Sequence, residues 1–208
     1  MSAIPNIELY LMPRPQEFPK NIAKWQVVPE KAVLLVHDMQ RFFIRKLPTP
    51  DPRNALLSNA TKLRQWCVSR NIPVAYTCQT GDMTAQQRGL LKSFWGAGMK
   101  AVLIDREVVD ELYPAPEDWI FDKWRYSAFY NSNLLQRIKA EDRNQLIICG
   151  IYAHIGILAT SIDAFSHDIE TFIVGDAVAD FSKDHHIMAL NYVARCCGVV
   201  TSTREVVR

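Results

Sequence analysis

The side chains best suited to chemistry each follow a short apolar run in this sequence. Asp38, Gln79 and Lys123 stand two residues beyond three such runs, and a fourth run ends at Gly150 and leads into the turn at residues 152–156. A carboxyl group, an amide, a cation and free N–H groups together could exchange a proton and bind an anion. The question is whether the fold brings these four positions to one place.

Residues 145–165 are the segment around which the chain is organised. Residues 146–149 are uniformly apolar, as in a strand buried on both faces of a parallel sheet, and Gly150 marks the end of that strand. Helical spacing follows, at Ile155, Leu158, Ile162 and Phe165. This pattern predicts a strand, a turn and a helix whose first N–H groups form an anion site, where Gly156 would let a ligand approach the backbone.

The remaining elements alternate between strand and helix patterns. Further strands are predicted at residues 32–36, 73–77, 119–121, 172–174 and 199–202. Helices are predicted after Asp51–Pro52, from the Thr84/Gln87 capping box through residues 88–95, at residues 106–112 and 134–139, and after Ser182. The alternation predicts a doubly wound α/β fold, a three-layer sandwich around a mostly parallel six-stranded sheet, in which ligands bind at the carboxyl ends of the strands.

Length and composition narrow the possible classes of protein. The 208 residues suit one domain, and five prolines in residues 1–30 predict an irregular N-terminal arm before a single domain at residues 31–208. A net charge of +2 gives no reason to expect nucleic acid or a membrane surface as a partner. Five cysteines without a regular spacing, and no secretory signal, predict reduced thiols and a cytoplasmic location.

The same residues also have simpler interpretations. Asp38 could be a solvated loop acid and Lys123 a surface lysine, and Arg88 could be a solvated residue of a capped helix. The histidines match no zinc-binding spacing, and adjacent strand residues such as His37 and Asp38 should point to opposite faces. No metal site is therefore predicted.

Five sequence blocks resemble those of a known family. AVLLVHDMQ, GLLKSFWGAGM, KWRYSAF, GIYAHIG and DAVADFS are similar to the signature blocks of the isochorismatases, a branch of the isochorismatase-like cysteine hydrolases, and the similarity covers nearly the whole chain. The wider superfamily has a Rossmann-like fold and an Asp, Lys and Cys triad. Asp38 and Lys123 match the first two members, whereas Gly156 stands where the cysteine would be, as it does in isochorismatases.

The resemblance implies a reaction without a covalent intermediate, because position 156 carries no thiolate. Asp38 is then the donor of a proton to the vinyl carbon of an enolpyruvyl ether, and Lys123 either orients Asp38 or stabilises charge beside it. An isolated aspartic acid is ionised at neutral pH. We hypothesise that Asp38 takes up a proton when the substrate, a small dicarboxylate, binds, because the substrate's carboxylates repel the ionised form of Asp38 in an apolar site. The expected binding residues are Gln79, Arg88, Tyr152, Gly156, Phe42, Trp95 and Tyr126, without cofactor or metal.

Within the family, the chain is most similar to the branch that hydrolyses 2-amino-2-deoxyisochorismate in phenazine biosynthesis. The chain ends at Arg208, so no carrier-protein domain is expected. Two alternatives stay open: a stand-alone isochorismatase of a siderophore pathway, and a non-catalytic docking module for a synthase. Relatives of this kind suggest a homodimer. No residue in the sequence distinguishes an amino from a hydroxyl group on the substrate ring.

Overall fold

A six-stranded parallel sheet forms the centre of the molecule in the computed structural model, which describes residues 4–208. The strands lie in the order β3-β2-β1-β4-β5-β6, and every neighbouring pair is parallel. Their bounds are β1 (Ala32–His37), β2 (Val74–Cys78), β3 (Trp119–Asp122), β4 (Gln145–Ile151), β5 (Glu170–Ala179) and β6 (Val199–Thr201). All six predicted strands are present, and β5 is longer than predicted.

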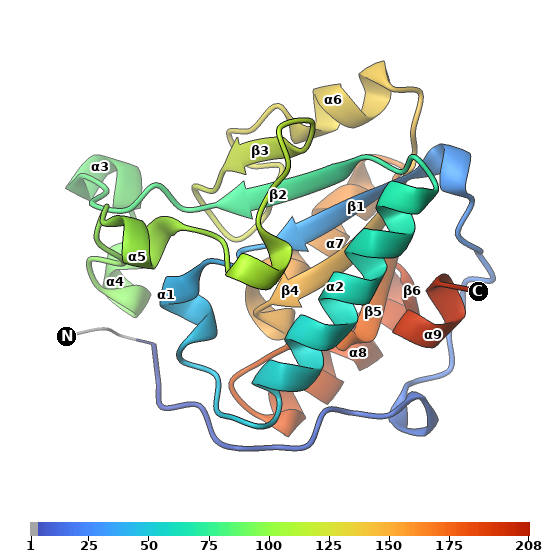
Figure 1. Ribbon diagram of the computed structural model, residues 1–208, viewed down its shortest axis with the longest axis horizontal. Coiled ribbons are helices and arrows are strands. Elements are labelled where there is room, and N and C mark those ends of the chain that lie inside the picture. Colours follow the sequence, from blue (N-terminus) through green and yellow to red (C-terminus); the bar gives the residue numbers. More distant parts are fainter. Residues whose placement is uncertain (1–3) are drawn as a thin grey trace.

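Helices cover both faces of this sheet and complete the three predicted layers (Figure 1). The helix α2 (Arg53–Ser69) and the short α9 (Thr203–Val206) lie on one face, and α6 (Leu134–Ala140), α7 (Leu158–Ser166) and α8 (Lys183–Cys196) lie on the other. Shorter helices surround the carboxyl ends of the strands: α1 (Arg41–Ile44), α3 (Ala85–Arg88), α4 (Leu91–Trp95), α5 (Leu103–Arg106) and the 3-10 turn η3 (Asp110–Leu112). No helix in residues 4–208 has the length and hydropathy of a membrane span.

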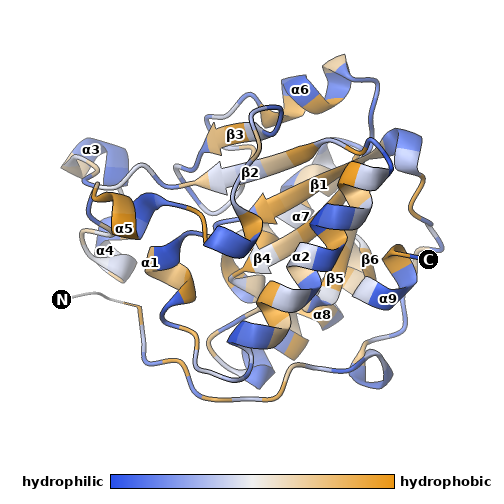
Figure 2. Ribbon diagram, viewed as in Figure 1, coloured by the Kyte–Doolittle hydropathy of each residue, from blue (hydrophilic) through white to orange (hydrophobic). Residues whose placement is uncertain are grey.

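The alternation of side chains along the strands produces two separate cores. Leu34 and Val36 of β1 pack under α2 on one face, whereas Val33 and Leu35 pack under the helices of the opposite face. Figure 2 shows the result, since β1 and β4 are largely apolar while α2 alternates between polar and apolar residues. Burial on both faces explains why these strands read as continuous apolar runs in the sequence.

Three helix predictions were wrong in detail. The helix predicted at residues 88–95 is two short helices, since the chain turns at Gly89, where φ is +50°. The helix predicted at residues 106–112 is α5 followed by η3, because the Glu107 carbonyl accepts a hydrogen bond from the Arg41 N–H at 2.8 Å. Pro52, not Asp51, occupies the N-cap of α2, and no side chain caps that helix.

The predicted strand, turn and helix at residues 145–165 are present, with an unpredicted detail in the turn. The turn is π-helical at η4 (Ala153–Ile157) before α7 begins, and the Ile151–Tyr152 peptide bond is cis. Two proline peptides, Thr49–Pro50 and Asp51–Pro52, are also cis. The turn therefore differs in geometry from an ordinary helix N-terminus.

The N-terminal arm holds the short 3-10 turns η1 (Pro15–Glu17) and η2 (Pro29–Lys31) and is tied to the domain along its length. The Asn21 side chain donates to the Val200 carbonyl and accepts from the Val200 N–H, both at 2.8 Å, which satisfies backbone groups of the outermost strand. Nearer the N-terminus, the Tyr10 hydroxyl accepts a hydrogen bond from the Asp180 N–H at 2.8 Å. The arm is thus part of the folded domain.

Candidate active site

A cavity opens at the carboxyl ends of the strands, with an empty volume of about 660 Å³ that includes open solvent. All nine residues that the sequence predicted for the site line this cavity: Asp38, Phe42, Gln79, Arg88, Trp95, Lys123, Tyr126, Tyr152 and Gly156. They come from segments as much as 118 positions apart. The parallel sheet brings them together because the carboxyl ends of its strands share one edge.

Asp38 is the carboxyl group of the cavity, and it is 8% exposed. Its Oδ1 accepts a hydrogen bond from the Thr77 hydroxyl at 2.7 Å, and its Oδ2 lies 3.5 Å from Lys123 Nζ. The backbone leaves β1 at Asp38, where φ is +53°. His37 Nδ1 is 3.8 Å from Oδ2, which contradicts the expectation that the two side chains point to opposite faces.

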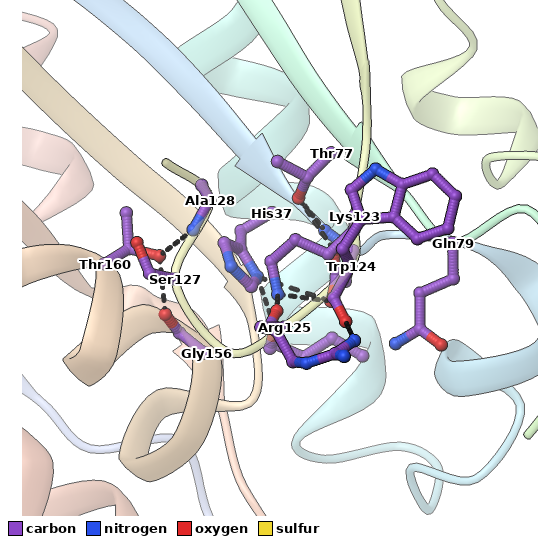
Figure 3. A network of polar contacts seen from close by, with 12 residues as sticks. His37, Thr77, Gln79, Lys123, Trp124, Arg125, Ser127, Ala128, Gly156 and Thr160 are labelled. Carbon is purple, nitrogen blue, oxygen red and sulfur yellow. Dashed lines mark hydrogen bonds and ion pairs between the residues drawn. The ribbon is translucent and has the colours of Figure 1, made fainter. Parts of the chain in front are cut away.

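Lys123 is almost completely buried, and its ammonium group faces Asp38 from the end of β3. Its Nζ donates to the Arg125 carbonyl at 2.5 Å, a contact that belongs to the network in Figure 3. Burial lowers the pKa of Lys123, and the nearby Asp38 carboxylate acts in the opposite direction. The Thr77 hydroxyl and the Lys123 ammonium group thus contact the two different oxygens of the Asp38 carboxyl group.

Gln79 is held in place by Gln40, a residue of the first signature block. The Gln40 side chain accepts from the Gln79 N–H at 2.7 Å and donates to the Gln79 carbonyl at 2.9 Å. The Gln79 Oε1 accepts from Arg88 Nη1 at 3.2 Å. The Gln79 side-chain amide is thereby oriented beside a guanidinium.

Arg88 is a buried cation without a carboxylate partner in residues 4–208. Besides Gln79, its guanidinium donates only to backbone carbonyls, that of Gly96 at 2.9 Å and that of Trp95 at 3.4 Å. Burial and the neighbouring Arg125 guanidinium lower the pKa of Arg88. A buried cation that faces a cavity without a counter-charge favours the binding of an anion.

The turn after β4 offers fewer free N–H groups than the sequence suggested. The His154 N–H donates to the buried Asp180 carboxylate at 2.6 Å, and the N–H groups of Ile155 and Ile157 both donate to the Tyr152 carbonyl. The same Asp180 carboxylate contacts His154 Nδ1 at 2.6 Å. Most of the expected anion site at this helix start is therefore occupied by the protein itself.

The space beside Gly156 is filled by the imidazole of His37. A Cβ atom at position 156 would lie 2.4 Å from His37 Cε1, closer than real Cβ atoms come to their neighbours, and 3.1 Å from Nε2. His37 Nδ1 donates to the Ile151 carbonyl at 2.7 Å, and burial lowers the pKa of His37 to about 4. His37 is thus a neutral, fixed ring at pH 7 that leaves no room for a cysteine side chain at position 156.

Aromatic side chains form the apolar walls of the cavity. The indole N–H of Trp95 donates to the Tyr126 hydroxyl at 2.8 Å and so links two loops across the mouth of the cavity. The Tyr152 ring packs on Phe181 with a centroid distance of 4.5 Å. Its hydroxyl is buried and has no hydrogen-bond partner in the part of the chain that the structure describes.

Sequence reasoning missed several lining residues, of which Ile4, Arg125 and Phe181 have the most direct bearing on the cavity. Arg125 and Phe181 stand inside the KWRYSAF and DAVADFS blocks, so the blocks contained a signal for both. Ile4 belongs to the N-terminal arm, which local patterns assigned only to the surface. In residues 4–208, no group of three histidine, cysteine or acidic side chains is arranged to hold a metal ion.

Comparison with known proteins gives a consistent result. Residues 32–205 match the isochorismatase domain family. The chain is 56% identical over 208 residues to the phenazine biosynthesis protein PhzD of Pseudomonas fluorescens, and the match covers 100% of both chains. It is 44% identical to enterobactin synthase component B of Escherichia coli, and that match covers 98% of this chain and 72% of that protein. A cysteine hydrolase of Pseudomonas syringae pv. phaseolicola has the same fold, with a TM-score of 0.77, 23% identity and coverage of 91% and 96%.

The fit between His37 and Gly156 predicts the effect of a small side chain. We expect Gly156→Ala to lower the free energy of unfolding by about 1–3 kcal/mol, because the new Cβ overlaps the His37 ring. Urea unfolding of the four proteins in a double-mutant cycle with His37→Ala measures this coupling. Gly156→Ala should cost clearly less in the His37→Ala background, and an equal cost in both backgrounds would contradict the steric explanation.

Proposed function

Because this chain belongs to the isochorismatase family, we propose that it hydrolyses the enolpyruvyl ether of 2-amino-2-deoxyisochorismate in phenazine biosynthesis. The products are pyruvate and trans-2,3-dihydro-3-hydroxyanthranilate. The observation that carries this proposal is a buried Asp38 that faces a cavity without a thiol at position 156. The full-length identity of 56% to a phenazine biosynthesis protein, against 44% to an enterobactin synthase component, favours this pathway over the siderophore alternative.

The reaction begins with the transfer of a proton from the Asp38 carboxyl group to the terminal vinyl carbon. This step turns the vinyl ether into an oxocarbenium ion, and water then adds to the cationic carbon. The proton released by the added water passes to the Asp38 carboxylate and regenerates the acid, and the resulting hemiketal collapses to pyruvate and the ring alcohol. No covalent enzyme intermediate is needed, in agreement with the filled space at Gly156.

Asp38 must carry a proton when the substrate is in place. The Thr77 hydroxyl and the Lys123 ammonium group contact its two oxygens. A bound dicarboxylate would add negative charge and exclude water, and both effects favour the neutral acid. Lys123 would keep the acid oriented and balance the charge beside it.

The other predicted residues would bind and enclose the substrate. Within residues 4–208, the buried Tyr152 hydroxyl has no hydrogen-bond partner and the Arg88 guanidinium has no carboxylate partner, so both are suited to a carboxylate of the ligand. Gln79 would donate from its oriented amide, and Gly156 would let the ligand reach the backbone. Phe42, Trp95 and Tyr126 would exclude water around the ether.

The direct test is an assay of pyruvate release with two substrates that differ only in the ring substituent. We expect 2-amino-2-deoxyisochorismate to be turned over with a higher kcat/KM than isochorismate. The opposite order of the two kcat/KM values would favour the alternative, a stand-alone isochorismatase of a siderophore pathway. If neither substrate releases pyruvate, the non-catalytic docking module would be the remaining hypothesis.

The role of Asp38 has its own test. We expect Asp38→Asn to lower kcat by about 10²–10⁴-fold, because an amide cannot deliver the proton, while the substrate still binds in isothermal titration calorimetry. Asp122→Asn is the matched control, since this acid lies at the exposed end of β3 and should not alter kcat. Turnover by Asp38→Asn at the wild-type rate would contradict the assignment of Asp38 as the proton donor.

A homodimer and a cytoplasmic location complete the proposal. Val102, Leu103 and Ile104 form a run of exposed apolar side chains, which suits a contact between protomers. All five cysteines are free thiols, which suits a reducing compartment. We expect sedimentation velocity to give a mass near twice 23.8 kDa at micromolar concentration. A species at the monomer mass throughout would contradict the dimer.

A further inference from the structure

The N-terminal arm is fixed to the domain by specific contacts although it has little regular structure. Glu17 pairs with Lys183 at 2.5 Å. The ring of Phe18 fills the space beside Gly175, since a Cβ atom at position 175 would lie 2.7 Å from Phe18 Cζ. The arm therefore follows one course over the domain, and its first described residues come to a defined place.

That place is the cavity at the carboxyl ends of the strands. Ile4 lines the cavity together with Phe42 of α1 and Trp95 of α4. Figure 1 shows the blue arm crossing the molecule and ending near these two helices. Ile7, three residues further along, is 5% exposed and packs in the core. The arm thus adds an apolar wall that neither the sheet nor its covering helices supply.

Tyr10 connects the arm with the segment that follows β5. Its hydroxyl accepts a hydrogen bond from the Asp180 N–H at 2.8 Å and lies 3.2 Å from His186 Nδ1. His186 Nε2 lies 2.9 Å from the Gly175 carbonyl, which can only accept, so Nε2 carries the ring proton and Nδ1 accepts from Tyr10. Burial lowers the pKa of His186 to about 4 and raises the pKa of Tyr10, so both side chains are neutral at pH 7.

Asp180 connects this anchor with two parts of the cavity wall. Its carboxylate accepts the His154 N–H at 2.6 Å and the Phe181 N–H at 2.8 Å. His154 lies in η4, and Phe181 lines the cavity and packs on the Tyr152 ring. Asp180 is completely buried, so loss of the Tyr10 hydroxyl would leave its backbone N–H unpaired in the interior.

Resting on the proposed function, we infer that the N-terminal arm is a wall of the active site, in which Ile4 encloses the bound substrate and Tyr10 is a positioning residue. Tyr10 does not line the cavity itself. It acts by holding the arm that carries Ile4 and by fixing the backbone of Asp180 beside Phe181. A wall contact is present before and during proton transfer, so its loss should raise KM and leave kcat nearly unchanged.

The first measurement is the kinetics of pyruvate release from 2-amino-2-deoxyisochorismate by Ile4→Ala. We expect KM to rise about five- to tenfold, because apolar contact with the substrate is lost, and kcat to stay within about twofold of the wild-type value. Leu9→Ala is the matched control, since it shortens an apolar side chain of the same arm that is 60% exposed. It should change neither constant.

The second measurement is a double-mutant cycle with Tyr10→Phe, which removes only the hydroxyl. We expect Tyr10→Phe to lower kcat/KM about tenfold, mainly through KM. Ile4→Ala should then cost less than about twofold in the Tyr10→Phe background, because the arm is no longer held against the cavity. Tyr192→Phe, at a side chain of α8 that is 44% exposed, is the matched control and should have no effect. A loss of folded protein would lower kcat without raising KM, so the two constants separate positioning from stability.

An unchanged KM in Ile4→Ala would overturn the inference. Independent losses that multiply in the double variant would also overturn it, because Tyr10 would then have a structural role unrelated to Ile4. A wild-type protein that releases no pyruvate from either substrate would defeat the proposed function and this inference together. Normal pyruvate release by the wild type and by both arm variants would defeat the inference alone.

Discussion

The contact between Asp38, Thr77 and Lys123 is the interaction on which the site depends. It joins the ends of three neighbouring strands, since Asp38 follows β1, Thr77 lies in β2 and Lys123 follows β3. The backbone has a positive φ at Asp38, where the chain leaves β1. A buried lysine and a buried aspartate stabilise each other here, so removal of either charge leaves the other one unpaired in a poorly solvated place.

The His37 ring fills the space beside Gly156, and this restricts the kind of reaction that the site can perform. The His37 imidazole lies where a side chain of residue 156 would project, and its Nδ1–H is bound to the Ile151 carbonyl. Because burial lowers the pKa of His37 to about 4, the ring adds no charge beside Asp38 at neutral pH. The filled space at position 156 is compatible with the proposed reaction, which uses a single acid and needs no thiol.

The walls of the cavity come from segments with little regular structure. The stretch between β2 and β3 contributes Arg88 and Trp95, and the loop after β3 contributes Arg125 and Tyr126. Hydrogen bonds from Arg125 to the Gln87 carbonyl and from Trp95 to the Tyr126 hydroxyl hold these two loops together. The sheet therefore places the acid, while the segments joined by these hydrogen bonds place the groups that we propose to bind the ligand.

The sequence by itself determined the strands and the parallel sheet, and together with the family resemblance it identified nine of the residues that line the cavity. The strands follow from local patterns, because a strand buried on both faces is apolar throughout and presents its polar residues at its end. The tertiary structure alone decided that His37 fills the space at Gly156, that Asp180 takes the N–H of His154, that the helix pattern breaks at Gly89, and that Arg125 lines the cavity. Each of these features depends on contacts between residues that are distant in the sequence, or on a backbone turn that such contacts stabilise. The local spacing of residue types therefore does not predict them.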